Sequence, residues 1–159
     1  MGKKQTQSGP LTARTKWRMR AVEILYEAES RDEPVETVLR ERADRAAADP
    51  EAPRLPAYAE QLVRGVADRI DGIDEALREA ASGWAIERMP AVDRNVLRVG
   101  LYEIRFVEDV DVPVAIKEAL RVAEQIGSSD DPSFVNAVLD RAARLKWNDE
   151  SDEDHGSED

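Results

Sequence analysis

The stretch that decides the fold runs from Thr12 to Ser30 and reads TARTKWRMRAVEILYEAES. At about 100° per residue, its apolar side chains fall on two faces of a helix rather than on one. The first face consists of Trp17, Ala21, Ile24, Leu25 and Ala28. The second face consists of Met19, Val22 and Tyr26. A helix that is apolar on two faces must be covered from both sides. The sequence therefore predicts a central helix between two layers of other helices.

The remainder of the chain shows helical periodicity and no sustained strand alternation. Helices are predicted over 35–47, 57–81, 90–107, 113–126 and 132–145, with a short helical turn within 84–89. Prolines mark several of the starts, and a glycine follows the helix of 113–126. Three prolines between 49 and 56 exclude a helix there, so this stretch is predicted to be a connector. The fold class is all-α, with about six to seven helices.

The composition bounds the class of protein. The chain has 159 residues, a usual size for one domain, and contains no cysteine, which excludes disulfides and cysteine-based zinc sites. No apolar run approaches the roughly 18 residues of a membrane span, and no apolar stretch near the start resembles a signal peptide. We therefore expect a cytoplasmic protein with a disordered leader (1–10), a helical domain (11–147) and a disordered acidic tail (148–159).

Charge is strongly polarised along the chain, whose net charge is −11. The first twenty residues contain no acid and hold Lys3, Lys4, Arg14, Lys16, Arg18 and Arg20. Cations at a helix N-terminus oppose the helix dipole by a few tenths of a kcal/mol each, and such local conflicts often mark a functional surface. We predict that this helix end projects beyond its packing partners and binds a phosphate backbone. An ordinary charged helix end is the alternative.

Catalysis is not expected. The single histidine, His155, lies in the acidic tail without metal-ligand or nucleophile neighbours. The glycines form no phosphate-binding loop. We therefore predict a binding protein that is not an enzyme and has no metal and no cofactor.

Some side chains allow two interpretations. Phe134, near a predicted helix start, is either a core residue or a platform on which a base stacks. Trp17 and Trp84 are interpreted as packing residues. Three arginines share a narrow arc of one helix and are interpreted as pairing with acids on the surface or within that helix, such as Asp93 or Glu103: Arg94, Arg98 and Arg105.

Several stretches together resemble the NusB family in their order and spacing. They are AVEILY at 21–26 after a basic lead, RMPAVDRNVLRVGLYEI at 88–104, and VPVAIKEAL at 112–120 leading to FVNAVL at 134–139. The resemblance extends over about 12–145, and the middle stretch is the most specific. It implies two small helical bundles that share a long N-terminal helix, in agreement with the two-faced helix above.

The resemblance also implies a function, which is transcription antitermination. Members bind the boxA element of ribosomal RNA transcripts together with NusE, a small-subunit ribosomal protein, and join RNA polymerase. Carried over to this chain, the implied RNA-binding residues are Arg14, Lys16, Arg18, Asp130 and Phe134. Asp93 is implied to face NusE. The head departs from the family pattern because Thr15 and Trp17 separate its basic residues.

Other functions stay open at this stage. The family is similar to the N-terminal domain of certain ribosomal-RNA cytosine methyltransferases, which would need a catalytic domain that this sequence does not contain. A second alternative is an interaction module that binds a ribosomal protein but binds RNA only weakly. A homodimer that buries the RNA-binding face is a further hypothesis.

Overall fold

The computed structural model describes residues 10–146. Seven α-helices and one 3₁₀ turn make up this part of the chain, which contains no strand. The elements are α1 (Ala13–Arg31), α2 (Val35–Ala48), α3 (Ala57–Asp68), α4 (Ile70–Ala81), η1 (Ile86–Arg88), α5 (Ala91–Phe106), α6 (Val112–Ile126) and α7 (Ser133–Arg144). The all-α prediction is confirmed. The predicted leader, apart from Pro10, and the predicted acidic tail lie outside the described residues.

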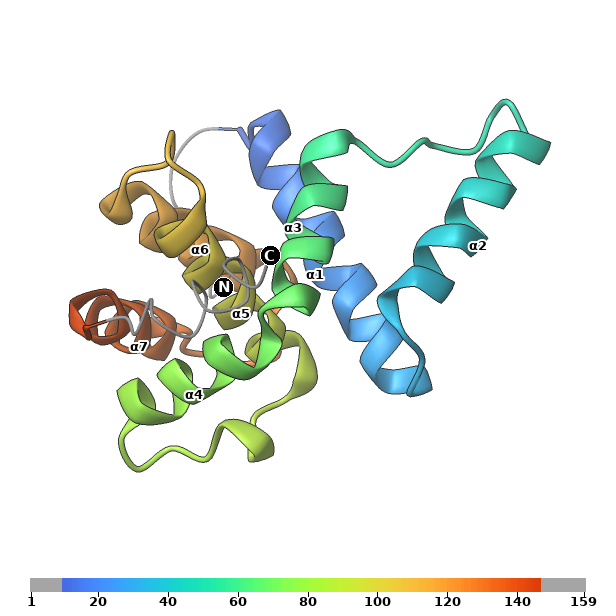
Figure 1. Ribbon diagram of the computed structural model, residues 1–159. Helices are drawn as coiled ribbons and strands as arrows, with labels where there is room; N and C mark the ends of the chain where they lie inside the picture. The colour runs from blue at the N-terminus through green and yellow to red at the C-terminus, as the bar shows by residue number, and fades with distance from the viewer. Residues whose placement is uncertain (1–9, 147–159) are drawn as a thin grey trace, which may run out of the picture.

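Helix α1 lies between two groups of helices (Figure 1). It packs against α2 and α3 on one side and against α5 and α6 on the other. Ala21 and Ile24 of one predicted face and Val22 of the other are buried, whereas Tyr26, which was assigned to the second face, is 42% exposed. The helix begins at an N-cap, Thr12, whose hydroxyl accepts a hydrogen bond from the amide of Thr15 at 3.1 Å. The predicted central position of this helix is confirmed.

The predicted helix over 57–81 is wrong in one respect, because the chain turns at Arg69. Helix α3 ends there and α4 begins, and Arg69 has φ −120° and ψ 24°. Helix α3 packs on α1 and α5, whereas α4 packs on α7 and α5. One straight helix would not cover both surfaces. The turn preserves the helical phase, so that Val66 and Ile73 remain buried on either side of it, and periodicity did not reveal the break.

Close packing joins α5 to its neighbours. Most of α5 is buried, and it packs chiefly against α6, α1 and α7. A Cβ atom at Gly100 would lie 2.6 Å from Leu139 and 3.2 Å from Ala119, so glycine lets three helices approach closely. This core holds the α6–α7 segment against α5. None of the helices in residues 10–146 is long and apolar enough to cross a membrane.

The arginine stripe of α5 pairs between helices rather than within α5. Arg98 donates two hydrogen bonds to Asp74 of α4 at 2.8 and 2.9 Å and one to Glu29 of α1 at 3.0 Å. Arg94 also pairs with Glu29. Arg105 donates to the carbonyls of Ala142 and Leu145 at the end of α7. The expectation of pairing on the surface or within the helix therefore missed the physical role, which is to join α5 to α1, α4 and α7.

Candidate nucleic-acid interface

Among the basic residues that the first turns of α1 carry, Lys16 is exposed, whereas Arg14 and Arg20 are half-buried, each with 35% of its side chain exposed. The Arg14 guanidinium lies 4.2 Å from the centre of the Tyr58 ring, in cation–π geometry. It also lies 3.3 Å from a carboxylate oxygen of Asp109, in the α5–α6 loop. The side chain of Lys16 is exposed, and the first turn of α1 contains no acid. This surface combines exposed positive charge with an aromatic ring.

Arg18 lies in the interior of the protein and not on the predicted phosphate-binding surface. Its residue exposure is 3%, and its Nε is 2.9 and 2.8 Å from the two carboxylate oxygens of Glu103 on α5. Its Nη1 donates to Glu118 of α6 at 3.1 Å. Arg18 is therefore an internal ion-pair partner and is not exposed to a phosphate. The helix end is also not projecting, because Thr15 is buried as well.

A buried polar network surrounds Arg18 and holds the start of α1. The Thr15 hydroxyl donates to Glu118 at 2.5 Å, and the Tyr58 hydroxyl donates to Glu103. Burial, together with the nearby Glu103 carboxylate, raises the pKa of Tyr58, so its hydroxyl remains a donor at neutral pH. Arg121 lies 3.7 Å from Glu118 and donates to the Pro10 carbonyl at 3.3 Å. The network fixes the orientation of the first turns of α1.

Sequence reasoning missed this network, although one signal was present. Glu103 is an acid within the otherwise apolar run of 101–104 on a mostly buried helix. Buried carboxylates need a partner, so its position called for an arginine from another helix. The choice of Arg18 over Arg14 or Arg20 depends on packing.

A second surface lies where α4 and η1 meet the start of α7. Trp84 is 49% exposed, and its ring makes an edge-to-face contact with Phe134, with centroids 5.5 Å apart. Phe134 is half-buried, packed on one side against the core. Asp130 is exposed in the preceding loop, and Asp131 accepts a hydrogen bond from the Ser133 amide at 3.1 Å. The interpretation of Trp84 as a packing residue was therefore incomplete, because half of it faces solvent.

Asp93 is buried and not on the surface implied for it. It is 1% exposed, and its Oδ1 accepts a hydrogen bond from the Ser128 amide at 3.2 Å. Its Oδ2 has no hydrogen-bond partner among the described residues, and burial raises the pKa of this carboxyl group. A Cβ atom at Gly127 would lie 2.6 Å from Oδ1. Asp93 thus holds the loop that leads to Asp130 and Phe134.

Helix α6 connects the two surfaces. Glu118, in the middle of α6, accepts hydrogen bonds from Thr15 and Arg18. The last residues of α6 lead into the loop that is hydrogen-bonded to Asp93. The positions of Arg14 and Phe134 therefore depend on the same helix. Glu118 lies eight residues before Ile126, the last residue of α6, so the two attachment points are about 12 Å apart along the helix at 1.5 Å per residue.

Comparison with known sequences identifies relatives over most of the chain. The model of the NusB family matches residues 15–144. The transcription antitermination protein NusB of Saccharopolyspora erythraea is 47% identical over 135 residues, which are 84% of this chain and 88% of the relative. That of Salinispora arenicola is 41% identical over 133 residues, which are 84% of this chain and 96% of the relative.

Solved structures agree with the sequence relatives. A structure of NusB from T. maritima superposes with a TM-score of 0.71 at 31% identity, covering 91% of this chain and 99% of that chain. The solution structure of NusB from Aquifex aeolicus gives a TM-score of 0.65 at 25% identity, covering 81% of this chain and 86% of that chain. This chain therefore belongs to the NusB family of transcription antitermination proteins.

Proposed function

We propose that this antitermination protein binds boxA-type RNA of ribosomal RNA transcripts, together with NusE, in a complex with RNA polymerase. The observation that carries the proposal is the start of α1, where Arg14 lies over the Tyr58 ring and Lys16 extends into solvent from another side of the helix, in a chain of net charge −11. Phosphate contacts supply most of the affinity of such complexes, and aromatic rings stack on bases exposed in single strands. The function is binding in the cytoplasm, without a catalytic step.

Each surface has its own role in this proposal. Arg14 and Lys16 neutralise phosphates, and the Tyr58 ring holds the Arg14 guanidinium in position before RNA arrives. Phe134 and Trp84, which are in edge-to-face contact, offer aromatic surface to an unstacked base. The Asp130 carboxylate can accept hydrogen bonds from a base amino group or a ribose hydroxyl.

The two buried residues act through position rather than through direct binding. Arg18 orients the first turns of α1 by pairing with Glu103 and Glu118. Asp93 orients the loop before α7 by accepting the Ser128 amide. Arg18 is 3% exposed and Asp93 is 1% exposed. We therefore assign neither residue to the surface that binds RNA or NusE.

One observation favours a second, weaker form of this function, in which RNA binds well only with a protein partner. Arg18 is buried, and Arg14 and Arg20 each lie near an acid, so among the basic residues of 12–20 only Lys16 has no ion pair with a described residue. The acidic body of the chain is suited to a basic protein such as NusE. A homodimer that covers the same face would compete with RNA.

The test is a titration of the protein with boxA RNA at low and high salt, with and without NusE. Arg14→Ala with Lys16→Ala should weaken RNA binding and reduce the salt slope by about 0.7 for each phosphate that is no longer neutralised. Arg45→Ala is the matched control, because Arg45 is exposed on α2, away from the head. Equal affinities and slopes for all three proteins would refute the proposed RNA surface. Light scattering in the same samples measures the homodimer.

A further inference from the structure

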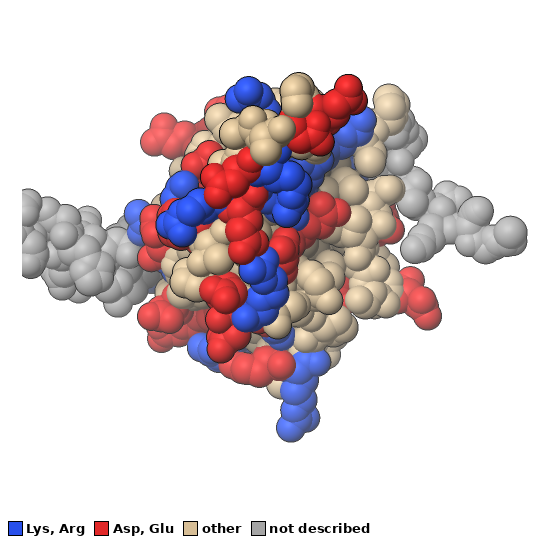
Figure 2. Space-filling model, turned by 90° about the vertical axis from the view of Figure 1, so that its right-hand side faces the viewer, with Lys and Arg blue, Asp and Glu red and all other residues tan. Residues whose placement is uncertain are grey.

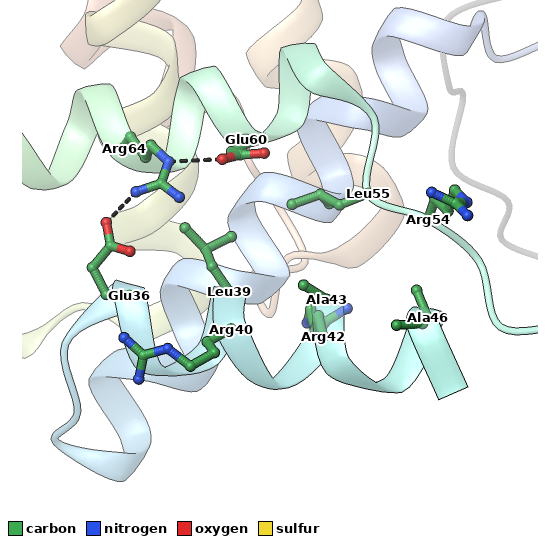
Figure 3. A pocket seen from close by; sticks show the side chains of 11 residues that line it. Glu36, Leu39, Arg40, Arg42, Ala43, Ala46, Arg54, Leu55, Glu60 and Arg64 are labelled. Carbon is green, nitrogen blue, oxygen red and sulfur yellow. Dashed lines mark hydrogen bonds and ion pairs between the residues drawn. The ribbon is translucent and has the colours of Figure 1, made fainter. Parts of the chain in front are cut away.

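A groove of about 460 Å³ lies between α2, α3 and the connector that joins them (Figure 3). It exists because α2 stands apart from the rest of the molecule and packs chiefly against α1 and α3 (Figure 1). The face that carries α2 shows acidic and basic side chains interleaved, without a continuous patch of one sign (Figure 2). What the groove can bind therefore depends on the residues that line it and not on the charge of that face as a whole.

The floor of the groove is apolar. Leu39 comes from α2 and Leu55 from the connector, and both point into the space between the two helices. Alanines of α2, among them Ala43 and Ala46, continue this floor toward the end of the helix. Their small side chains leave the volume open. An apolar floor of this kind becomes more stable when it is covered by apolar side chains.

The rim of the groove carries an excess of positive charge. Its two acids, Glu36 and Glu60, both pair with Arg64. Arg40 and Arg54 make no ion pair with any residue of the described range. Both guanidinium groups are exposed and therefore remain available to carboxylates of a bound segment.

Arg42 also lines the groove, but its guanidinium is engaged on the side of α1. Its Nη2 donates to Glu27 at 3.1 Å on the α1 side. Its Nε is buried and has no hydrogen-bond partner in residues 10–146. A buried donor without a partner is destabilising. Because this atom has almost no exposed surface, a group bound in the groove does not reach it, and Arg42 contributes only positive charge to the lining.

We propose that the groove binds an acidic amphipathic segment of a partner protein. Carboxylates of the segment pair with Arg40 and Arg54, and its apolar side chains cover Leu39 and Leu55. This arrangement corresponds to an amphipathic peptide lying in a groove, with charge at the rim and apolar anchors on the floor. The inference is independent of the RNA surface, since Arg14 and Lys16 do not line the groove.

Two other occupants fit less well. RNA would satisfy the arginines but would leave the apolar floor uncovered, and the groove has no aromatic lining on which bases could stack. The chain's own residues 148–159 offer many carboxylates but no apolar side chain. Of these occupants, only a segment that carries both carboxylates and apolar side chains is complementary to the rim and to the floor.

The experiment uses the full chain and a fluorescein-labelled helical peptide in which glutamates alternate with leucine pairs at helical spacing. A matched peptide carries serine at every leucine position. Fluorescence anisotropy measures binding to the wild type, to Arg40→Glu with Arg54→Glu, and to Ala43→Trp, which fills the groove without a change of charge. Arg45→Glu is the control, because it reverses a charge on the same helix outside the groove. Circular dichroism checks that each variant is folded.

We expect the leucine peptide to bind the wild type and to protect the amides of α2 from hydrogen exchange. The double charge reversal and Ala43→Trp should each weaken binding at least about tenfold, or about 1.4 kcal/mol, while Arg45→Glu changes it little. The proposal is overturned if the leucine peptide does not bind, or if the serine peptide binds equally well. It also fails if Arg45→Glu weakens binding as much as the groove variants, or if single-stranded RNA displaces the peptide at equal concentration.

Discussion

Arg18 and Glu103 form an ion pair inside the protein, in which Arg18 Nε lies 2.9 and 2.8 Å from the two carboxylate oxygens, with side-chain exposures of 4% and 1%. The two residues are 85 positions apart and belong to α1 and α5. Glu118 and Tyr58 complete the network. A buried ion pair with such geometry specifies how helices meet, although a well-packed apolar pair would often be as stable.

Removing one partner of this pair should destabilise the fold strongly. We expect Arg18→Met to lower the free energy of unfolding by about 3–5 kcal/mol, because Glu103 is left buried without its counter-charge. Arg18→Met combined with Glu103→Met should lose less than the single variant. Urea denaturation measures both. If the double variant loses as much free energy of unfolding as the single variant, or more, the pair does not act mainly by specifying how the helices meet.

Asp109 should restrain Arg14 and thereby weaken RNA binding. Because the pair is exposed, its energy is at most about 1 kcal/mol, so Asp109→Asn should raise RNA affinity by no more than about fivefold. Glu108→Gln is the matched control, since it removes an adjacent exposed charge that makes no ion pair in the described range. Filter binding at low salt measures the three proteins. If the two variants behave alike, the effect is one of net charge and not of Arg14.

The exposed ring of Trp84 should contribute to RNA binding more than to stability. Trp84→Ala and Phe134→Ala should each weaken RNA binding by about 1–3 kcal/mol, the usual value of a base stacked on an aromatic ring. Trp84→Ala should change stability by less than about 1 kcal/mol, because half of the side chain is already in solvent. Tyr26→Ala removes another exposed aromatic side chain, on α1, and serves as the control. A larger loss of stability than of affinity for Phe134→Ala would make Phe134 a core residue.

Asp93 should make stability depend on pH in a definite direction. Burial raises its folded-state pKa, so the native protein binds this proton more readily than the unfolded chain does. The ionised carboxylate is therefore destabilising at neutral pH, and this cost is relieved as the pH falls through the folded pKa. Asp93→Asn should be at least as stable as the wild type at neutral pH, with a difference that shrinks in acid. A constant difference across the pH range, measured by thermal unfolding, would show that the charge of Asp93 is not responsible.

Much of the secondary structure was predictable because its signals are local. The prolines and glycine that bound the helices, and the two apolar faces of α1, lie within a few residues of the features they predict. The break at Arg69 was not predictable in the same way. The chain keeps its apolar phase through the turn, and the cause of the break is the separate packing of α3 and α4.

In the candidate site, too, local features were predictable from the sequence and features that depend on packing were not. Charge and spacing marked the basic head, and the resemblance to the NusB family added Asp130 and Phe134. Arg14 and Arg18 are one helical turn apart and chemically identical, so periodicity does not distinguish them. One is at the surface beside Tyr58 and the other is buried. Their difference arises from Glu103, which comes from another helix.

Helical periodicity, capping residues and charge order are properties of neighbouring residues, and they determine an all-helical chain with a central α1 and a basic start. Burial and ion pairing join residues far apart in the chain, and they depend on how the helices pack. The tertiary structure therefore decides that Arg18 is an internal ion-pair partner, that Asp93 holds a loop, and that Trp84 stands in solvent against Phe134. Desolvation is the physical reason, because an ionised side chain is stable inside a protein only where packing brings it a partner.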